Sequence, residues 1–316
     1  MMSLLPSREE IGYAASLLRA GKLVAFPTET VYGLGANALD ETAVRQIFEA
    51  KGRPTSSPII VHVSNMPMVR RVVAEWPHHA EVLAERFWPG PLTLVLKKQS
   101  AVPALVTAGL ETVGVRMPAS PIALALIEAA QMPIAAPSAN RFTQLSPTTA
   151  QHVREGLGDR VEYILDGGPC TVGIESTVLS LAGTNPVLLR PGGISRRQIE
   201  DVIGSVEQPL EAPTEAHPAP GMHPRHYSPR TRLLLVQKGS VPQAGSGAYL
   251  QLQHAPAAPV RHVICMPADA EPYAAQLYGV LHSLDAQDYD WVAVDVPPDT
   301  PEWEAVRDRL QRAATK

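Results

Sequence analysis

Cysteine is scarce in this chain: Cys170 and Cys265 are the only two among 316 residues, and they lie far apart in the sequence. Their spacing matches no metal-binding or redox motif, so a structural disulfide is not expected and a reducing compartment fits best. We therefore predict two half-buried free thiols.

Long apolar runs are also missing. No stretch approaches the 18 or more apolar residues that a membrane-spanning helix needs. The first ten residues lack the basic region and apolar core of a secretion signal. This pattern predicts a cytoplasmic protein with no targeting segment and no membrane partner.

A surplus of positive charge is absent as well. Residues 1–204 carry 18 Lys and Arg against 18 Asp and Glu, and residues 205–316 carry 9 against 13, which gives the net charge of −4. Proteins that bind a nucleic-acid backbone normally carry more Lys and Arg than Asp and Glu. We therefore expect weak or no direct binding of nucleic acid, with a few cations at particular points.

Several familiar site motifs cannot be found. The chain has neither the P-loop pattern nor the G-x-G-x-x-G fingerprint of dinucleotide folds. Cys170 has no basic neighbour, and no Ser-His-Asp set can be read, so no covalent nucleophile is predicted. His223 and His226 form H-x-x-H without further ligands, which argues against a structural metal.

Short apolar strands alternating with amphipathic helices are present instead. Ser7 and Glu10 form a capping box that starts a helix closed by Gly21. Strands are expected at 23–26, 59–63, 92–96, 113–117, 134–136, 163–165, 178–181 and 187–189, and further helices at 41–51, 121–131, 147–157 and 195–203. This order predicts a mixed sheet covered by helices.

Composition divides the chain into three parts. Residues 205–230 hold six prolines, three histidines and almost no large aliphatic side chain, so they cannot bury a core and are interpreted as a linker. We expect a first domain at 1–204 and a small α/β domain at 231–316. The small domain should alternate strands at 233–236, 263–266 and 291–296 with helices at 271–285 and 301–314.

Five polar motifs lie at the ends of apolar runs in the first domain. Each places hydroxyls, glycine amides or cations where the backbone is free to face a ligand. The motifs are Pro-Thr-Glu-Thr-Val-Tyr-Gly-Leu-Gly at 27–35, Lys-Gly-Arg-Pro at 51–54, Val-Gly-Val-Arg-Met-Pro at 113–118, Pro-Ser-Ala-Asn at 137–140 and Leu-Arg-Pro-Gly-Gly at 189–193. Together they have the composition of an anion-binding cleft.

Each motif also has a plainer interpretation. Residues 27–35 can be a glycine turn after a strand, and Lys51 and Arg53 can complement a helix dipole instead of clamping a triphosphate. Arg116 needs a carboxylate or phosphate partner, which an internal acid can supply. His62 is more often a hydrogen-bonded strand histidine than a ligand residue.

Taken in order, the five motifs and the segment Pro-Gly-Met-His-Pro-Arg-His-Tyr-Ser-Pro at 220–229 resemble the threonylcarbamoyl-AMP synthase family over essentially the whole chain. The resemblance implies α/β architecture: a YrdC-like twisted mixed sheet with helices around a concave cleft, plus a smaller C-terminal Rossmann-like α/β domain. It implies an enzyme that joins L-threonine, bicarbonate or CO2 and ATP, with Mg2+ accompanying ATP, and releases pyrophosphate.

The same resemblance implies site residues, carried over motif by motif. The threonine site would contain Tyr32, His62, Arg116, Ala136 and Ser176. The ATP site would contain Arg53, Ser57, Thr112, Ser138, Ser146, Arg190 and Tyr227, and the catalytic set Lys51, Arg53, Ser138 and Asn140. No residue is expected to ligate a metal.

Two of these residues carry further expectations. Ser57 stands where many relatives have Asn, so we expect an altered contact with the nucleotide. Ser146 is also an expected N-cap for the helix after Pro147.

Downstream, the product would pass to a complex that modifies tRNA at adenosine 37, beside the anticodon. In relatives the linker folds over the cleft, which suggests a lid that excludes water. Two alternatives stay open: an RNA-binding module, and a nucleotide-sensing domain without turnover.

Overall fold

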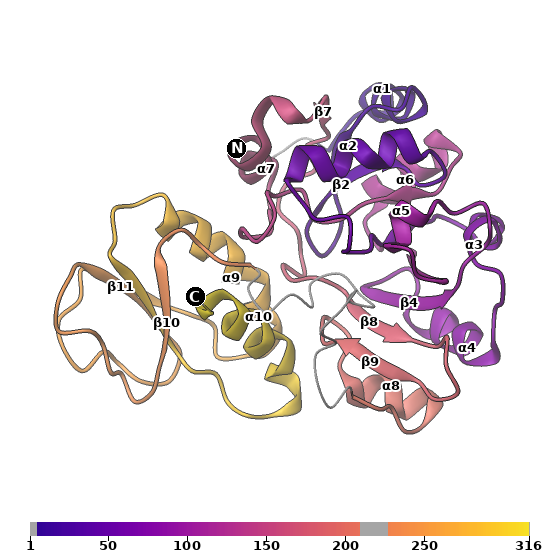
Figure 1. Ribbon diagram of the computed structural model, residues 1–316. Helices are drawn as coiled ribbons and strands as arrows, with labels where there is room; N and C mark the ends of the chain where they lie inside the picture. The colour runs from indigo at the N-terminus through magenta and orange to yellow at the C-terminus, as the bar shows by residue number, and fades with distance from the viewer. Residues whose placement is uncertain (1–4, 209–226, 316) are drawn as a thin grey trace.

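The structure, a computed structural model, describes residues 5–208 and 227–315. Its described residues form two bodies, one around a nine-stranded sheet and one around a four-stranded sheet, and the helices of the second face the first (Figure 1). The H-x-x-H pair of His223 and His226, and most of the segment predicted as a lid, lie outside the described residues.

The first body begins with the helix predicted from its capping box. Helix α1 (Arg8–Arg19) has Ser7 as its N-cap, and the side chains and backbone of Ser7 and Glu10 bond reciprocally. Ala14, Ala15 and Leu18 form its buried stripe, which packs against α6 (Pro121–Ala130). The predicted helix is confirmed at its N-terminal cap.

The large sheet is mixed, as predicted. Its order is β7-β1-β2-β6-β3-β5-β4-β8-β9, with parallel pairs β1/β7, β3/β5 and β4/β8 among antiparallel ones. The strands are β1 (Val24–Pro27), β2 (Tyr32–Asn37), β3 (Val61–His62), β4 (Leu92–Lys97), β5 (Thr112–Arg116), β6 (Ile134–Ala135), β7 (Tyr163–Ile164), β8 (Thr177–Ser180) and β9 (Val187–Arg190).

Strand β2 differs from the expectation, since the whole motif at 27–35 was interpreted as a turn. Residues 28–31 alone make the turn, and β2 then pairs antiparallel with β1 from Tyr32 onward. Its glycines fit the strand because the Phe26 ring crosses them: a Cβ on Gly35 would lie 2.8 Å from that ring. Glycine inside a strand often marks such a close approach.

Helices surround this sheet. They are α2 (Glu41–Lys51), α3 (Met66–Val72), α4 (His78–Phe87), α5 (Ala104–Thr107), α6, α7 (Ala150–Leu157), the short η1 (Gly158–Arg160) and α8 (Arg196–Ile203). The pair His78-His79 indicates a helix start in the sequence, and α4 does begin at His78, with Pro77 as an N-cap that provides no side-chain hydrogen bond. The N-cap prediction for Ser146 is wrong: Thr149 caps α7, and the Ser146 hydroxyl donates to Glu175 instead.

The C-terminal body has a parallel sheet in the order β10-β13-β11-β12. Its elements are β10 (Arg232–Val236), β11 (Gly247–Gln251), β12 (His262–Cys265), α9 (Ala270–Asp285), β13 (Trp291–Asp295), η2 (Pro301–Trp303) and α10 (Glu304–Ala314). The predicted α/β class is confirmed in both bodies. In the described part of the chain, no helix combines the length and apolarity needed to cross a membrane.

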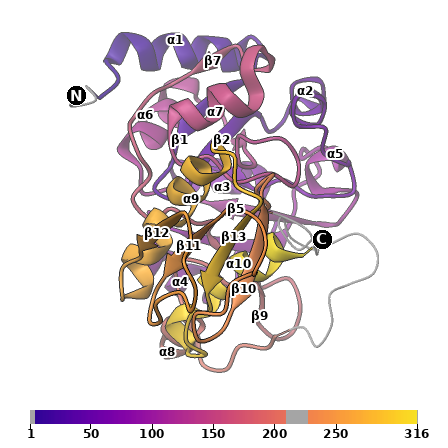
Figure 2. The same cartoon turned by 90° about the vertical axis from the view of Figure 1, so that its left-hand side faces the viewer.

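One apolar cluster crosses the boundary between the two bodies. Val31, Leu145 and Ile174 of the first body pack in the same cluster as Leu277 and Leu281 of α9. In Figure 2 the C-terminal body lies in front of the large sheet, with α9 and α10 near its middle. The loops that carry the predicted site residues therefore lie beside this boundary.

Candidate active site

A small cavity of about 50 Å³ lies where these loops meet. Eight of the fourteen residues predicted from sequence line it: Arg53, His62, Arg116, Ala136, Ser138, Ser176, Arg190 and Tyr227. They come from the end of α2, from β3, β5 and β9, and from the loops at 136–138 and 175–176. Ligand sites are usually several hundred Å³ in volume, so two substrates can enter only if wall side chains move.

Arg116, at the end of β5, is buried and contacts three groups of the first body. Its Nη2 pairs with the Glu29 carboxylate at 2.6 Å, its Nη1 donates to Thr30 at 3.0 Å, and its Nε donates to the Gly90 carbonyl at 3.1 Å. The alternative interpretation, an internal ion pair, is therefore correct. The guanidinium also lines the cavity. Its three contacts fix its position there.

His62 lies on β3, next to Arg116 on β5. Its side chain is buried, and its Nδ1 has no hydrogen-bond partner among the described residues. Burial, and then the charge of Arg116, lower the pKa of His62 to about 3. The imidazole is therefore neutral at physiological pH and offers a polar edge to a ligand in the cavity.

Arg53 follows the C-terminus of α2, where Gly52 has φ 63° and turns the chain sharply. Its Nη2 donates to the Ser57 hydroxyl at 2.5 Å and to the Pro58 carbonyl at 2.8 Å. Burial, and then the nearby charge of Arg190, lower the pKa of Arg53 to about 10, so it stays cationic. Ser57 does not line the cavity; it holds Arg53 in place.

Arg190 ends β9 and turns toward Ser176. It donates from Nε and Nη2 to the Ser176 carbonyl, at 3.1 and 2.9 Å, and from Nη2 to the Ser176 hydroxyl at 3.2 Å. Gly192 permits this contact, because a Cβ there would lie 2.3 Å from the backbone nitrogen of Thr177. Gly192 in the motif at 189–193 thus allows two backbone segments to approach each other closely.

Tyr227 also lines the cavity. Its φ is 59°, in the left-handed region that an aromatic residue rarely adopts. Its ring packs 6.0 Å from the Tyr278 ring, and the Arg309 guanidinium lies 5.2 Å from its centroid. Burial raises the pKa of the Tyr227 phenol. The side chain is thus neutral and is held by groups of the C-terminal body.

Two residues of the predicted catalytic set do not line the cavity. Lys51 donates to the backbone carbonyls of Ser138 and Asn140, and burial, then Arg53, lower the pKa of Lys51 well below its usual range. The Asn140 amide donates to two carbonyls of its own turn. Both residues therefore shape the 138–140 turn that presents Ser138 to the cavity.

The remaining predicted residues, Tyr32, Ser146 and Thr112, do not line the cavity. The Tyr32 phenol donates to the Gly168 carbonyl at 2.8 Å. Ser146 is buried and bonded to Glu175. Thr112 begins β5 and lies about 13 Å along the strand from Arg116, beside a separate small cavity.

Three lining residues with polar side chains lie outside the predicted site set: Thr28, Thr30 and Glu175. Thr30 stood within the motif at 27–35 but was not singled out. Glu175 is an acid in an apolar stretch next to the predicted Ser176, which was a usable signal. Its main partner, Arg309, lies 134 positions away and could not be inferred from spacing.

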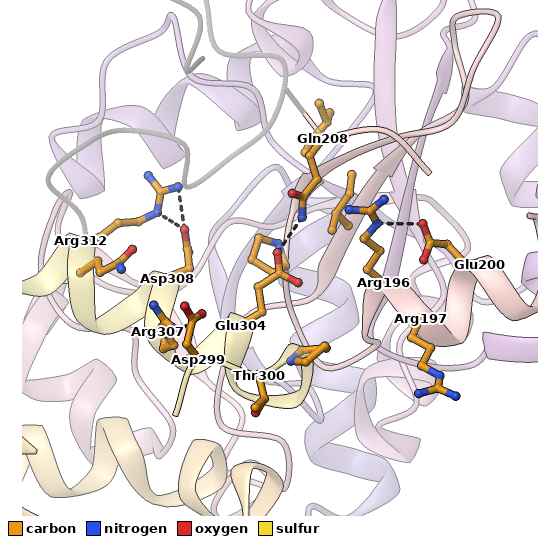
Figure 3. Close-up of a pocket in the computed structure, with 15 residues that line it drawn as sticks. Arg196, Arg197, Glu200, Gln208, Asp299, Thr300, Glu304, Arg307, Asp308 and Arg312 are labelled. Atoms are coloured by element: carbon orange, nitrogen blue, oxygen red, sulfur yellow. Dashed lines mark hydrogen bonds and ion pairs between the residues drawn. The ribbon is translucent and has the colours of Figure 1, made fainter. Parts of the chain in front are cut away.

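A second, larger cavity lies between α8, the end of β9, η2 and α10, and we call it the outer cavity (Figure 3). Its volume is about 720 Å³, yet none of the predicted site residues lines it. Its charges pair with one another: Arg196 with Glu200, Arg307 with Asp299, and Arg312 with Asp308. Because that lining is balanced, the small cavity is the better candidate for anionic substrates.

Comparison with known proteins shows the family of the chain. Residues 16–192 match the Sua5/YciO/YrdC family, described as telomere recombination, and residues 194–315 match the threonylcarbamoyl-AMP synthase C-terminal domain. The chain belongs to the threonylcarbamoyl-AMP synthase family. Both the predicted family and its long, two-part form are confirmed.

Curated relatives in this family extend over nearly the whole chain. A threonylcarbamoyl-AMP synthase of Bacillus subtilis is 45% identical over 96% of this chain and 93% of its own length. One of Pyrococcus abyssi is 53% identical over 72% of this chain and 68% of its own length, and one of Schizosaccharomyces pombe is 37% identical over 98% and 89%.

Solved structures of the same family share the fold. The P. abyssi Sua5 protein complexed with L-threonine superposes with a TM-score of 0.90 at 41% identity, covering 98% of this chain and 95% of that one. A doubly substituted form of the same protein gives a TM-score of 0.89. The arrangement of both bodies is therefore that of a threonylcarbamoyl-AMP synthase.

Proposed function

We propose that this chain condenses L-threonine, bicarbonate or CO2 and ATP into threonylcarbamoyl-AMP and pyrophosphate. The enzymatic activity follows from membership of the threonylcarbamoyl-AMP synthase family. The observation that carries the proposal is the convergence of Arg53, Arg116 and Arg190, each at most 7% exposed, on one cavity. Three guanidinium groups around one cavity favour the binding of anionic substrates.

In this proposal threonine occupies the end of the cavity near Arg116. Its carboxylate competes with Glu29 for the guanidinium, which can hold a carboxylate through two parallel hydrogen bonds. The His62 edge and the Ser176 hydroxyl supply polar contacts, and Ala136 limits the room for the side chain. The L-threonine complex of the P. abyssi relative supports threonine as the amino acid.

ATP occupies the opposite end, near Arg53 and Arg190. Both are held by neutral oxygens, of Ser57 and Ser176 respectively, and point their charge at the cavity. Tyr227 and Ser138 line the same end and supply an aromatic face and a hydroxyl. We propose that phosphates bind the two arginines and that the purine displaces or stacks on the Tyr227 ring.

The reaction then needs positioning and charge neutralisation more than a nucleophilic side chain. The threonine amine loses a proton and takes up CO2, or bicarbonate with loss of water, to form an N-carboxylate. An oxygen of that carboxylate forms a bond to the α-phosphorus, the bond from the α-phosphorus to the oxygen bridging to the β-phosphate breaks, and pyrophosphate leaves. Arginines in a low-dielectric cavity reduce the repulsion between the two anions.

Mg2+ has no ready ligand set in the protein. The described residues contain no group of three or more His, Cys, Asp or Glu side chains that could hold a metal ion. Glu175 is the one carboxylate in the cavity lining, and it is already bonded to Arg309, Tyr278 and Ser146. We therefore propose that Mg2+ enters with the phosphates of ATP, and no step here is assigned to it.

Several wider features also remain our proposals. They are the bounds 1–204, 205–230 and 231–316 for the two domains and the linker, a cytoplasmic location, and transfer of the product to a complex that modifies tRNA at adenosine 37. Free thiols at Cys170 and Cys265 fit a reducing compartment, although the prediction that both are half-buried is wrong, because Cys170 is buried and Cys265 is exposed. Direct tRNA binding is not proposed, because the first 204 residues carry equal numbers of positive and negative side chains and so no cationic excess.

Pyrophosphate release measured with each reactant omitted in turn tests this function. We expect release to require threonine, bicarbonate and ATP together, and to be unaffected by added tRNA at physiological salt. ATP binding without release would favour a nucleotide sensor. Salt-sensitive RNA binding without release would favour an RNA-binding module.

A further inference from the structure

Helix α10 carries an arginine, Arg309, whose side chain is entirely buried at the boundary between the two bodies. Its Nε donates to the Glu175 carboxylate at 2.7 Å, its Nη2 to the Pro191 carbonyl at 3.0 Å and its Nη1 to Asp308 at 2.5 Å. Glu175 and Pro191 belong to the first body. This one side chain therefore joins the C-terminal body to the first.

The groups that Arg309 contacts are parts of the cavity wall or next to it. Glu175 lines the cavity, and Pro191 directly follows Arg190, which lines it too. The guanidinium also lies 5.2 Å from the centroid of the Tyr227 ring, within cation–π range. Arg309 thus contacts two residues of the cavity lining, Glu175 and Tyr227, and the neighbour of a third, without lining the cavity itself.

Glu175 extends this connection to other elements. It accepts from the Ser146 hydroxyl at 2.5 Å and from the Tyr278 phenol of α9 at 3.1 Å. One carboxylate therefore collects donors from the loop before α7, from α9 and from α10. Removing Arg309 would leave that carboxylate buried without its cation, a costly state that its neighbours must accommodate by moving.

Fold stability alone is a weak reason for this arrangement. A buried ion pair loses much hydration, and apolar side chains of the same volume often give equal or greater stability. Tyr227 also keeps a left-handed backbone conformation that is unfavourable for a residue with a Cβ atom. Contact with Arg309 is one of the interactions that hold its ring in the wall despite that cost.

We propose that Arg309 is a positioning residue for ATP. Paired with Glu175, it fixes the Tyr227 ring and the Pro191 carbonyl beside Arg190, and so shapes the nucleotide end of the cavity. The C-terminal body then forms part of the ATP site. This inference rests on the proposed function, because it assumes that ATP binds at Arg53, Arg190 and Tyr227.

Steady-state kinetics of Arg309→Met and Arg309→Lys test it in the full chain. Methionine removes the charge at similar length, and we expect the KM for ATP to rise about 10-fold while the KM for threonine stays within about 2-fold. Lysine keeps the charge but lacks the planar fork, so a partial rescue, to about a 3-fold rise, is expected.

Arg307→Met is the matched control. Arg307 lies on the same helix, but it lines the outer cavity and pairs with Asp299 within the C-terminal body (Figure 3). We expect this variant to keep the KM for ATP of the unmodified chain. A rise equal to that of Arg309→Met would show that any change on α10 acts on the site, and would overturn the specific role of Arg309.

Two further results contradict the inference. One is an unchanged KM for ATP in folded Arg309→Lys. This result would contradict the positioning role even if Arg309→Met does not fold. The other is a proportional change in both KM values, which indicates general loosening of the fold. A failure of the unmodified chain to release pyrophosphate with threonine and bicarbonate would count against the proposed function instead.

Discussion

At the threonine end of the cavity, Arg116 is held by Glu29, Thr30 and the Gly90 carbonyl, so its guanidinium cannot turn freely. Its burial in an apolar strand was readable from sequence, and so was its need for an anionic partner. The identity of that partner was not, because Glu29 lies 87 positions earlier, in a turn that meets β5 only in the folded chain.

Replacing Arg116 with lysine should separate charge from geometry. Lysine keeps the cation but loses the parallel donors, so we expect Arg116→Lys to raise the KM for threonine by about 10- to 100-fold. The KM for ATP should change by less than about 3-fold. Pyrophosphate release at varied threonine concentration measures both constants.

Arg45→Lys serves as the control, because Arg45 is exposed and pairs only with Glu41 one turn earlier on α2. We expect its kinetic constants to equal those of the unmodified chain. An unaltered KM for threonine in Arg116→Lys would contradict the assignment of the threonine end.

At the scale of elements, the predicted strands and helices were close to those observed, and the exceptions have physical causes. Strand β2 was hidden because two glycines resemble a turn, although they make room for the Phe26 ring. Strand β11 (Gly247–Gln251) was missed because it starts with glycine, directly after Gly245 and Ser246; its central position, between β13 and β12, depends on partners distant in sequence.

A substitution at Gly173 tests how closely the two bodies join, because this residue contacts α9. A Cβ on Gly173, whose φ is 76°, would lie 2.5 Å from the Cα of Ala275, and neither backbone can give way easily. We expect Gly173→Ala to lower the free energy of unfolding by about 2 kcal/mol or more. Urea denaturation measures the change.

Gly279→Ala is the matched control on the same helix, since a Cβ there meets no atom within 4 Å. Alanine favours the helical state by about 0.5–1 kcal/mol over glycine, so this variant should be as stable as the unmodified chain or more so. Equal stability of Gly173→Ala and the unmodified chain would refute the tight contact.

Helices α7 and α9 meet through two stacked imidazoles. The rings of His152 and His282 lie 3.9 Å apart at 17°, and the His282 Nε2 lies 3.1 Å from the Ser146 carbonyl. Burial, and then His282, lower the pKa of His152 to about 4; burial lowers the pKa of His282 too. Both rings are therefore neutral at physiological pH, despite the nearby Glu155 and Asp285.

This pair predicts a loss of stability in acid. Because the folded pKa values lie below the unfolded ones, the unfolded chain binds more protons, and stability falls as pH drops from about 6.5 toward 4. Above pH 6.5 the pair contributes no pH dependence. We expect His152→Gln to flatten this slope in urea titrations at pH 7, 6 and 5, and a slope equal to that of the unmodified chain would contradict the prediction.

For the whole molecule, composition predicted the division into a larger and a smaller part and the lack of a cationic excess. It could not predict that Arg309 and Tyr278 of the smaller part bond to Glu175 in the cavity lining, or that His282 contacts Ser146 beside Glu175. Those contacts join residues more than 100 positions apart, and no local pattern encodes them. The chain is nearly neutral overall, yet it concentrates buried arginines in one small cavity.

The central claim is that this cavity brings two anions together so that a carbamate oxygen attacks ATP. The most direct measurement follows ¹³C from labelled bicarbonate by mass spectrometry, in a mixture of the purified chain, threonine, ATP and Mg2+. We predict one labelled product, threonylcarbamoyl-AMP, formed in equal amount to pyrophosphate and absent when threonine is omitted. Pyrophosphate without labelled adenylate, or no reaction with all reactants present, would contradict the account.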